Sequence, residues 1–457
     1  VSLGSRFYRQ KGRVTMDENE LMGSMKVSKA VAKMAIPSVI SSLVTVVYNM
    51  ADTFFVGQTG DPLQVAAVSL TNPIFILFMA FANMFGMGGS AAASMALGEK
   101  KEKRVKQVSS FITYASLIVG IVFAAILLVG MQPVLQLFGA DADTYELAKG
   151  YTTYISYGAP FIIWSATASF VVRADGASRE AMTGSMIGTV ANIILDPIFI
   201  SGFGMGAAGA AIATTIGNIM ASVYYLWYFC RKSRNMSMAF RYFKCGDRIL
   251  SQVCSAGLPT AIFSALMSIS TIILNQILVA YGNAPVAAIG IVFKANMFIT
   301  FLQMGLANGV QPLLGYSYGA GNRERFITVE RYTKKCCLIV GVLATALFFF
   351  FREPIIRLFI SDTEVINYGV EMLIAYMISG PVIGILFMNM NCMQSTGNAL
   401  PATILSILRQ GVLLIPVLYG LNALLGLHGV IYGQALTDYV AVLLSIVIWR
   451  WKRRKTL

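Results

Sequence analysis

A carboxylate, an amide and a proline interrupt a long apolar stretch in the sequence NIILDP at residues 192–197. Asn192 and Asp196 are four residues apart, so both lie on one face of a helix. Pro197 has no N–H and leaves the carbonyl of Ile193 without its helical hydrogen bond. The region therefore offers a carboxylate, an amide oxygen and a freed carbonyl. Such a set suits either a proton held with water or a hard cation such as sodium.

Asp196 lies in a stretch that is long enough to cross a bilayer, where a charged side chain costs on the order of 3 kcal/mol. Such a residue is by default part of an ion or proton path. The alternative is that Asp196 lies in a loop just beyond the membrane. Asp52 is a second acidic residue of this kind, and its alternative is a side chain that reaches the outer surface near Gly57. Two nearby carboxylates in a low-dielectric site cannot both ionise cheaply, so we expect at least one to bind a proton.

The composition identifies the class of protein that must position these residues. The chain has 457 residues, of which 56% are hydrophobic and 12% charged, whereas a soluble domain has roughly 25% charged residues. Apolar runs of about 20 residues, enough to cross a bilayer, recur from Val31 to Trp449. We count twelve of them. The sequence therefore predicts an all-α integral membrane protein with twelve transmembrane helices.

Lys and Arg are concentrated in alternate loops. Of the 35 Lys and Arg residues, 30 lie in six segments: 1–33, 98–106, 173–179, 231–248, 323–335 and 450–457. The positive-inside rule places these segments and both termini in the cytoplasm. The net charge of +14 is thus a topology signal, and we expect no nucleic-acid partner. The predicted location is the cell (inner) membrane, as a multi-pass protein in a lipid bilayer.

The sequence repeats itself in two halves. Gly98 recurs as Gly319 and Asp141 as Asp362, both at an offset of 221. An even number of spans makes the halves parallel repeats about an axis along the membrane normal. The predicted divisions are a cytoplasmic tail (1–30), an N-terminal six-helix bundle (31–230), a cytoplasmic linker (231–248), a C-terminal six-helix bundle (249–449) and a basic cytoplasmic tail (450–457).

The two halves differ in their acidic residues. The position equivalent to Asp52 is Leu274, and the position equivalent to Asp196 is Val417. We therefore assign the coupling carboxylates to the N-terminal half. The second half has other polar residues within its spans, which we interpret as possible cavity residues without assigning their roles: Lys294, Asn389, Asn391, Gln394, Arg409 and Asp438.

Three features resemble the multidrug and toxic compound extrusion (MATE) exporters of the wider flippase and exporter superfamily. They are YNMADTFFVG at residues 48–57, NIILDP at residues 192–197, and the two-half plan with glycines in matched loops. The similarity covers nearly the whole chain. It implies two pseudo-symmetric bundles in a V around a central cavity, and exchange of a proton or sodium for organic cations. It also implies an ion site and two hinges: Asp52, Asn192, Asp196 and Thr214 with Tyr151 adjacent, and Pro37 and Pro197.

One departure from the family pattern assigns the chain to a branch. NorM-like and eukaryotic members have an acidic residue in the seventh helix, whereas residues 259–276 contain none. The chain is therefore more similar to the prokaryotic branch whose coupling carboxylates lie in the N-terminal bundle.

These observations predict a secondary active antiporter that exports lipophilic organic cations by alternating access, coupled to protons or sodium. The alternative is a flippase for lipid-linked oligosaccharides or polysaccharides, which would need a strongly basic cavity. A third alternative, an intramembrane hydrolase, would need a paired Asp constellation or a Ser/His site. We expect no enzymatic activity, since His428 is the one histidine and lies at the outer edge. We also expect no cofactor and no metal other than a possible sodium ion at the site of Asp52 and Asp196. The partners are expected to be small cationic molecules, and the protein is expected to be a monomer.

Overall fold

The computed structural model describes residues 20–456, and in this part of the chain every regular element is a helix. The first three long helices of each half match in length. They are α2 (Val27–Gly57) and α9 (Ile249–Val279) with 31 residues each, α3 (Pro62–Gly98) and α10 (Asn283–Gly319) with 37 each, and α4 (Glu102–Val129) and α11 (Arg323–Phe350) with 28 each. Equal lengths at equivalent positions are the structural counterpart of the sequence repeat.

The later part of each half follows the same plan with local differences. Short helices α5 (Met131–Leu137) and α12 (Arg352–Arg357) follow the third long helix. α6 (Tyr145–Ala174) is one helix, whereas its counterpart consists of α13 (Thr363–Ile378) and α14 (Gly380–Ser395), bent by 45°. The remaining elements are α7 (Ser178–Pro197), η1 (Ile198–Gly202) and α8 (Gly206–Arg231) in the first half, η2 (Phe240–Tyr242) between the halves, and α15 (Ala399–Ile407), η3 (Leu408–Leu413) and α16 (Leu414–Thr456) in the second.

The helices account for twelve membrane spans. Ten described helices are long and apolar enough to cross a membrane, and the bent pair α13 and α14 makes an eleventh span. One of the ten covers 58 residues, 399–456, which is long enough for two crossings of about 20 residues each. Non-helical backbone at Gly426 (φ 59°, ψ −139°) divides it. The twelve spans predicted from the sequence are therefore confirmed.

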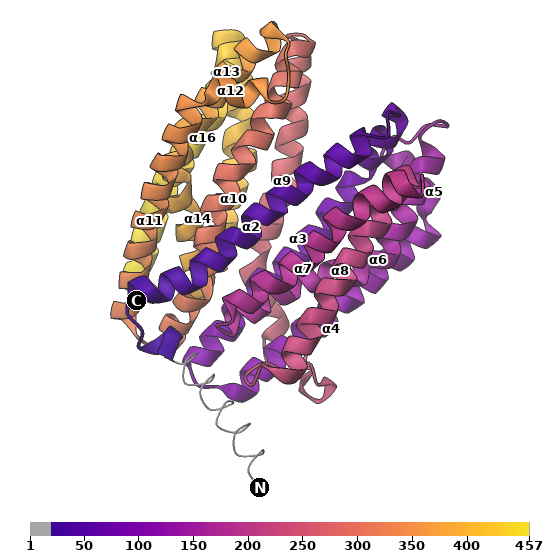
Figure 1. Cartoon of the computed structure of the whole chain (residues 1–457). Helices are drawn as coiled ribbons and strands as arrows, with labels where there is room; N and C mark the ends of the chain where they lie inside the picture. The colour runs from indigo at the N-terminus through magenta and orange to yellow at the C-terminus, as the bar shows by residue number, and fades with distance from the viewer. Residues whose placement is uncertain (1–19, 457) are drawn as a thin grey trace.

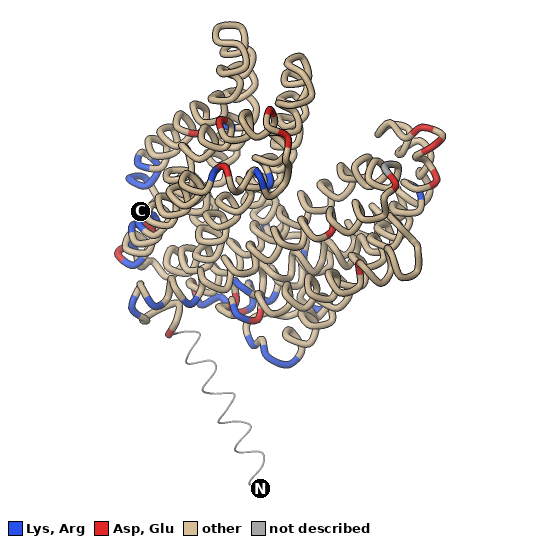
Figure 2. The backbone as a smooth tube through the Cα atoms, turned by 45° about the horizontal axis from the view of Figure 1, so that its top comes forward, with Lys and Arg blue, Asp and Glu red and all other residues tan. Residues whose placement is uncertain are grey.

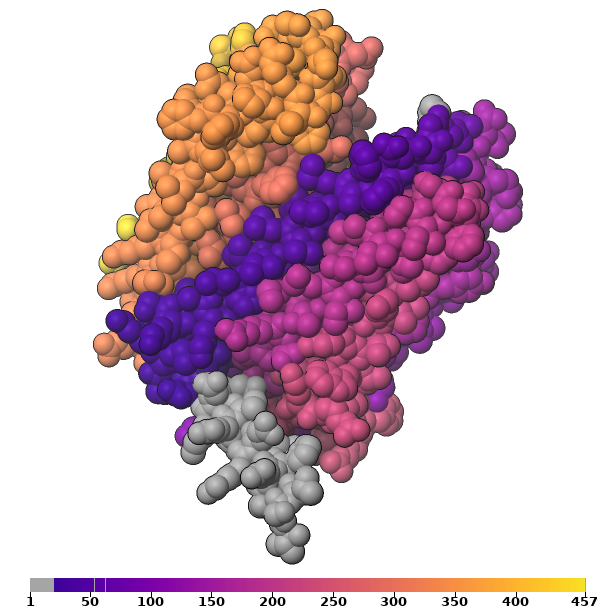
Figure 3. Space-filling view, in the orientation of Figure 1, coloured from indigo at the N-terminus to yellow at the C-terminus, as the bar shows by residue number. Residues whose placement is uncertain are grey.

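The two halves form two bundles that meet at one end and diverge toward the other (Figure 1). α2 crosses between them. Its first part packs on α10 of the second half, where a Cβ added to Gly309 would lie 2.9 Å from the Cα atom of Ala35. Its later part packs on α7 and α8 of its own half. The space-filling view shows a notch between α2 and the upper part of the C-terminal bundle (Figure 3).

Glycines bring the two bundles into backbone contact where they meet. A Cβ atom on Gly88 of α3 would lie 1.9 Å from the carbonyl oxygen of Val253 in α9. One on Gly257 of α9 would lie 1.8 Å from the carbonyl oxygen of Met84. No side chain fits at such distances, so these helices touch only because both positions are glycine.

The matched glycines of the sequence repeat form a second contact of this kind. A Cβ atom on Gly98 would lie 2.2 Å from the carbonyl oxygen of Tyr316 in α10. One on Gly319 would lie 2.0 Å from that of Met95 in α3. The repeated positions therefore face each other across the junction of the two bundles.

The end at which the bundles meet is also rich in Lys and Arg, and we call it the basic end. It comprises 98–106, 173–179, 231–248, 323–335 and 450–456. Figure 2 shows Lys and Arg gathered there and a group of Asp and Glu at the opposite tip of the N-terminal bundle, which we call the acidic end. The basic residues 450–456, assigned to a tail from the sequence, continue α16 as helix.

Arg325 of α11 attaches the chain before α2 to the C-terminal bundle. Its guanidinium donates hydrogen bonds to the carbonyl oxygens of Leu21 (3.1 Å), Met22 (2.8 Å) and Met25 (2.8 Å). Leu21 and Met22 are buried. The described part of the predicted N-terminal tail is thus an ordered contact with α11, while residues 1–19 lie outside the described residues.

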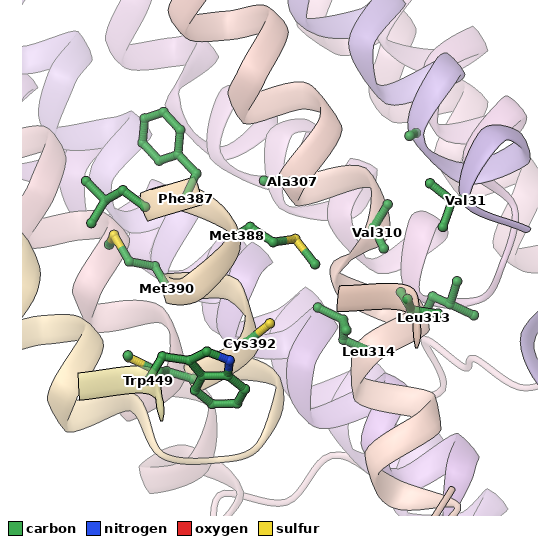
Figure 4. Close-up of a cluster of buried hydrophobic side chains, with 14 of the residues drawn as sticks. Val31, Ala307, Val310, Leu313, Leu314, Phe387, Met388, Met390, Cys392 and Trp449 are labelled. Carbon is green, nitrogen blue, oxygen red and sulfur yellow. The ribbon is translucent and has the colours of Figure 1, made fainter. Parts of the chain in front are cut away.

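A cluster of buried apolar side chains joins the start of α2 to the second half (Figure 4). Its labelled members come from α2 (Val31), α10 (Ala307, Val310, Leu313, Leu314), α14 (Phe387, Met388, Met390, Cys392) and α16 (Trp449). α2 belongs to the first half by sequence, yet its first turns are part of this cluster of the C-terminal bundle. A movement of one bundle relative to the other must therefore bend or displace α2.

The linker of the sequence analysis, 231–248, fills the interval between the end of α8 and the start of α9. It is held against the N-terminal bundle by the buried carboxylate of Asp175, which accepts hydrogen bonds from Tyr228 (2.8 Å), Ser233 (2.7 Å) and Asn235 (3.0 Å). The linker therefore packs on the first half before the chain enters the second.

Candidate functional site

Asp196 lies in the last turn of α7, inside the N-terminal bundle and not in a loop. Its side chain is fully buried. The amide nitrogen of Asn192, one turn earlier, donates to its Oδ1 atom at 3.4 Å. The two residues therefore share one helical face, as their spacing predicts.

Thr214 of α8 connects this pair to two further helices. Its hydroxyl lies 3.2 Å from the Asn192 amide nitrogen, which donates to it. The same hydroxyl lies 3.3 Å from that of Tyr48 in α2. A short polar chain thus joins α2, α7 and α8 within an otherwise apolar bundle.

Asp52 lies one turn after Tyr48 on α2 and is partly buried. It interacts electrostatically with Asp196, with Tyr48 and with the buried Tyr151 of α6. Asn192, Asp196 and Thr214 are therefore in hydrogen-bond contact, and Asp52 of α2 and Tyr151 of α6 lie within electrostatic range of Asp196. The family resemblance assigned these five residues to ion coupling, and that role stays a prediction.

Two acceptor atoms in this cluster are buried and unpaired. Asp196 Oδ2 and Asn192 Oδ1 have no hydrogen-bond partner among residues 20–456. A buried unpaired oxygen is costly, and a charged one more so, unless a proton, a cation or water satisfies it. The two oxygens, with Asp52 close by, form a site that can accept positive charge. No group of three or more His, Cys, Asp or Glu in the described part is arranged to hold a metal.

The two prolines occupy different positions in their helices. Pro37 lies ten residues inside α2, so it is not a first-turn proline, and the helix continues across it. Pro197 is the last residue of α7, and the π-helical turn η1 follows it directly. Prolines and π-helical turns are the usual positions at which a helix bends. Their role as hinges stays a prediction.

The MatE family model matches the chain twice, over residues 37–198 and 259–419. The two matches begin at Pro37 and Pro259, which are equivalent positions of the repeat, and together they cover more than half of the chain. The chain belongs to the MatE family.

Relatives of this MatE protein are named for export. The multidrug export proteins MepA of Staphylococcus saprophyticus and of Staphylococcus aureus are each 32% identical to it over 422 residues, which are 92% of this chain and 93% of theirs. A crystal structure of MATE in the straight conformation has a TM-score of 0.91 at 25% identity and covers 96% of this chain and 98% of that one. A structure of MATE in the bent conformation has a TM-score of 0.88 at 26% identity and covers the same shares.

Three of the polar residues predicted in the second half of the MatE fold are buried on α14 but bond in different directions. The amide of Asn389 donates to Ser445 of α16 (2.9 Å), and that of Asn391 to Asn308 of α10 (3.0 Å). Gln394 donates to a threonine hydroxyl of α9 at 3.1 Å. These side chains join α14 to three neighbouring helices, and they do not form one polar site.

The three charged residues predicted to line the cavity of the second half separate into an ion pair and one exposed lysine. Arg409 of η3 donates from Nε to Asp438 Oδ1 at 2.9 Å, and both are buried. Lys294, which the sequence analysis placed with them, is exposed on α10. It lies eleven residues from Gly305, so it shares the α10 face that contacts α2. Lys294 is therefore not part of the buried Arg409–Asp438 pair. Its long side chain can reach water where the bundles diverge.

Sequence reasoning missed two members of the N-terminal polar cluster. Tyr48 lies within the motif that carried the family resemblance, and its spacing of four from Asp52 places both on one helical face. Asn218 donates to the Thr214 carbonyl at 2.8 Å and accepts from Ser165 at 2.8 Å. Asn218 lies four residues after Thr214, and this spacing would have placed both residues on one face of the helix.

Proposed function

We propose that this protein is a multidrug exporter that expels lipophilic organic cations in exchange for protons or sodium ions. The observation that carries the proposal is the pair of buried, unpaired acceptor oxygens of Asp196 and Asn192 beside a second carboxylate, Asp52. The names of the MepA relatives support the cargo class. A flippase is not favoured, because Arg409 is neutralised by Asp438 and the relatives are named for multidrug export.

The exchange follows from competition for one negative site. A lipophilic cation and a proton or sodium ion each neutralise the carboxylates, so binding of one weakens binding of the other. A proton entering down a potential of 100 mV supplies about 2.3 kcal/mol per charge. Neutralisation removes the cost of burying Asp52 and Asp196, and α2 then bends at Pro37 to close the cavity behind the departing cation.

The orientation follows from the charges. The positive-inside rule places the basic end, and with it both termini, in the cytoplasm. The glycine contacts close the molecule at that end, so this conformation opens to the outside. Lys294 and the notch beside α2 belong to the open part. We propose that the transporter works as a monomer, since each chain carries both bundles.

The test is ethidium efflux from cells that express Asp196→Asn beside wild type. We expect efflux to fall by about tenfold or more, since the substitution removes the charge for which ion and cargo compete. Asp143→Asn, at an exposed position of the acidic end, is the matched control and should leave efflux unchanged. Normal efflux by the Asp196 variant at equal expression would contradict the proposal.

Transport of ethidium into proteoliposomes with an imposed pH gradient or an imposed sodium gradient identifies the coupling ion. A proton site predicts transport with the pH gradient alone. A sodium site predicts transport with the sodium gradient alone. Ethidium movement that is independent of both gradients would exclude antiport.

A further inference from the structure

We propose that Asp438, Phe263 and Phe387 form a second cation-binding site, in the C-terminal bundle, which the guanidinium of Arg409 occupies in this conformation. Arg409 would thus be an internal substitute for a lipophilic organic cation. The proposal rests on the proposed function for the kind of cation that enters, but the site itself is independent of Asp196.

Side chains from three helices, α9, α14 and α16, surround the Arg409 side chain. Its Nε atom donates to Asp438 Oδ1 at 2.9 Å. Its guanidinium carbon lies 5.2 Å from the ring centre of Phe263 in α9 and 5.8 Å from that of Phe387 in α14. Gln434 of α16 donates to the same carboxylate oxygen at 3.0 Å. The guanidinium is therefore held by one carboxylate and two aromatic rings.

This environment is suited to a cation that has few hydrogen-bond donors. Arg409 Nη1 is buried and has no hydrogen-bond partner in the described part of the chain, and the side chain is only 7% exposed. A guanidinium normally uses its several N–H donors, whereas here charge and ring faces supply much of the attraction. A quaternary ammonium or a phosphonium has no N–H group to leave unpaired, and an aromatic cation such as ethidium adds a ring system that can stack on Phe263 or Phe387.

The position of the site connects it to the junction of the bundles. Phe263 is partly exposed on α9, the helix whose Gly257 touches the backbone of α3. Arg409 emerges from the π-helical turn η3, and Ser270 of α9 donates to the carbonyl of the next residue, Gln410. A change of packing between α3 and α9 therefore acts on the same helix that lines the site and holds η3.

Removing the tethered cation should open the site. We expect the purified full-length Arg409→Met protein to bind ethidium at one additional site per chain, or roughly tenfold more tightly than wild type, as measured by ethidium fluorescence titration. Arg409→Met combined with Asp438→Asn should lose this gain, because no negative charge remains. The combined variant replaces a buried ion pair with neutral residues, which proteins often tolerate.

Arg357→Met is the matched control. Arg357 pairs with Glu353 at 2.8 Å on the exposed surface of the same half, so the variant also frees a carboxylate. It should bind ethidium as wild type does. Equal gains in the Arg357 and Arg409 variants would refute a local site and indicate a general effect of charge.

A monodisperse Arg409→Met protein that binds ethidium as wild type does would overturn the proposal. If the methionine variant does not fold, Arg409→Gln provides the same test, since its shorter amide leaves the rings free. The Asp196→Asn substitution distinguishes the two proposals. It should lower efflux by about tenfold or more without removing the Asp438-dependent ethidium binding gained in the Arg409 variant. Either result can therefore fail while the other stands.

Discussion

The Thr214 hydroxyl is the atom through which α2, α7 and α8 meet in the N-terminal site. It bonds with Tyr48 and with Asn192, and Asn192 in turn bonds with Asp196. Thr214 thus orients an amide that contacts the coupling carboxylate, without carrying charge itself. Its loss should alter the placement of the site and leave its charge unchanged.

We therefore expect Thr214→Val to lower ethidium efflux several-fold and to destabilise the protein by about 1–3 kcal/mol, because two buried polar partners lose a hydrogen bond. Thr214→Ser keeps the hydroxyl and should retain most of the efflux rate and most of the stability. Melting temperature in detergent and efflux rate are the two measurements. Equal behaviour of the valine and serine variants would show that the hydroxyl has no role.

The long helices α3 and α9 are joined by backbone contact, and this contact sets how closely the bundles approach. Gly257→Ala would place a Cβ atom 1.8 Å from the Met84 carbonyl oxygen, so the helices must separate. Overpacking of this kind costs about 1–3 kcal/mol. We expect a lower melting temperature and weaker ethidium efflux.

Gly290→Ala in α10 is the control for that experiment, since a Cβ atom there meets nothing within 4 Å. It should match or exceed the wild-type melting temperature, because alanine favours helix over glycine by up to about 1 kcal/mol. Similar losses from both substitutions would show that the close contact of α3 with α9 is not responsible.

The two bundles taken together form a molecule that is closed at the basic end and divergent at the acidic end (Figure 1). α2 runs from the closed end to the divergent end: its start packs in the C-terminal bundle and its later turns pack in the N-terminal bundle. Alternating access therefore requires the two ends to change in opposite directions. Both changes can be measured between exposed positions.

We expect two spin labels to approach each other, one at Asp143 at the acidic end of the N-terminal bundle and one at Glu364 at the start of α13 in the C-terminal bundle, whenever labels at Lys101 and Arg323 at the basic end move apart. The physical reason is that α3 and α10 are too closely packed at their glycines to shift at one end alone. Double electron–electron resonance, measured with and without ethidium on a protein whose native cysteines have been replaced, gives these distances. Parallel lengthening of both pairs would contradict alternating access.

The sequence by itself determined the membrane class, the twelve spans, the repeat and the placement of Asn192 and Asp196 on one helical face. These features depend on local composition and on spacing along one helix, as the Asn192 and Asp196 pair illustrates. Thr214 and Tyr151 were assigned to the site only through the family resemblance, because spacing along one helix cannot connect residues of α6 and α8 to Asn192 and Asp196 of α7.

Only the tertiary structure decided how residues on different helices pair. Lys294 and Arg409 are both cations within apolar spans, yet one is exposed and the other is buried against Asp438. Likewise Tyr48 meets Thr214 from 166 positions away. Hydropathy fixes that a helix crosses the membrane, but the rotation of each helix about its axis, which sets these partners, depends on side-chain packing against its neighbours.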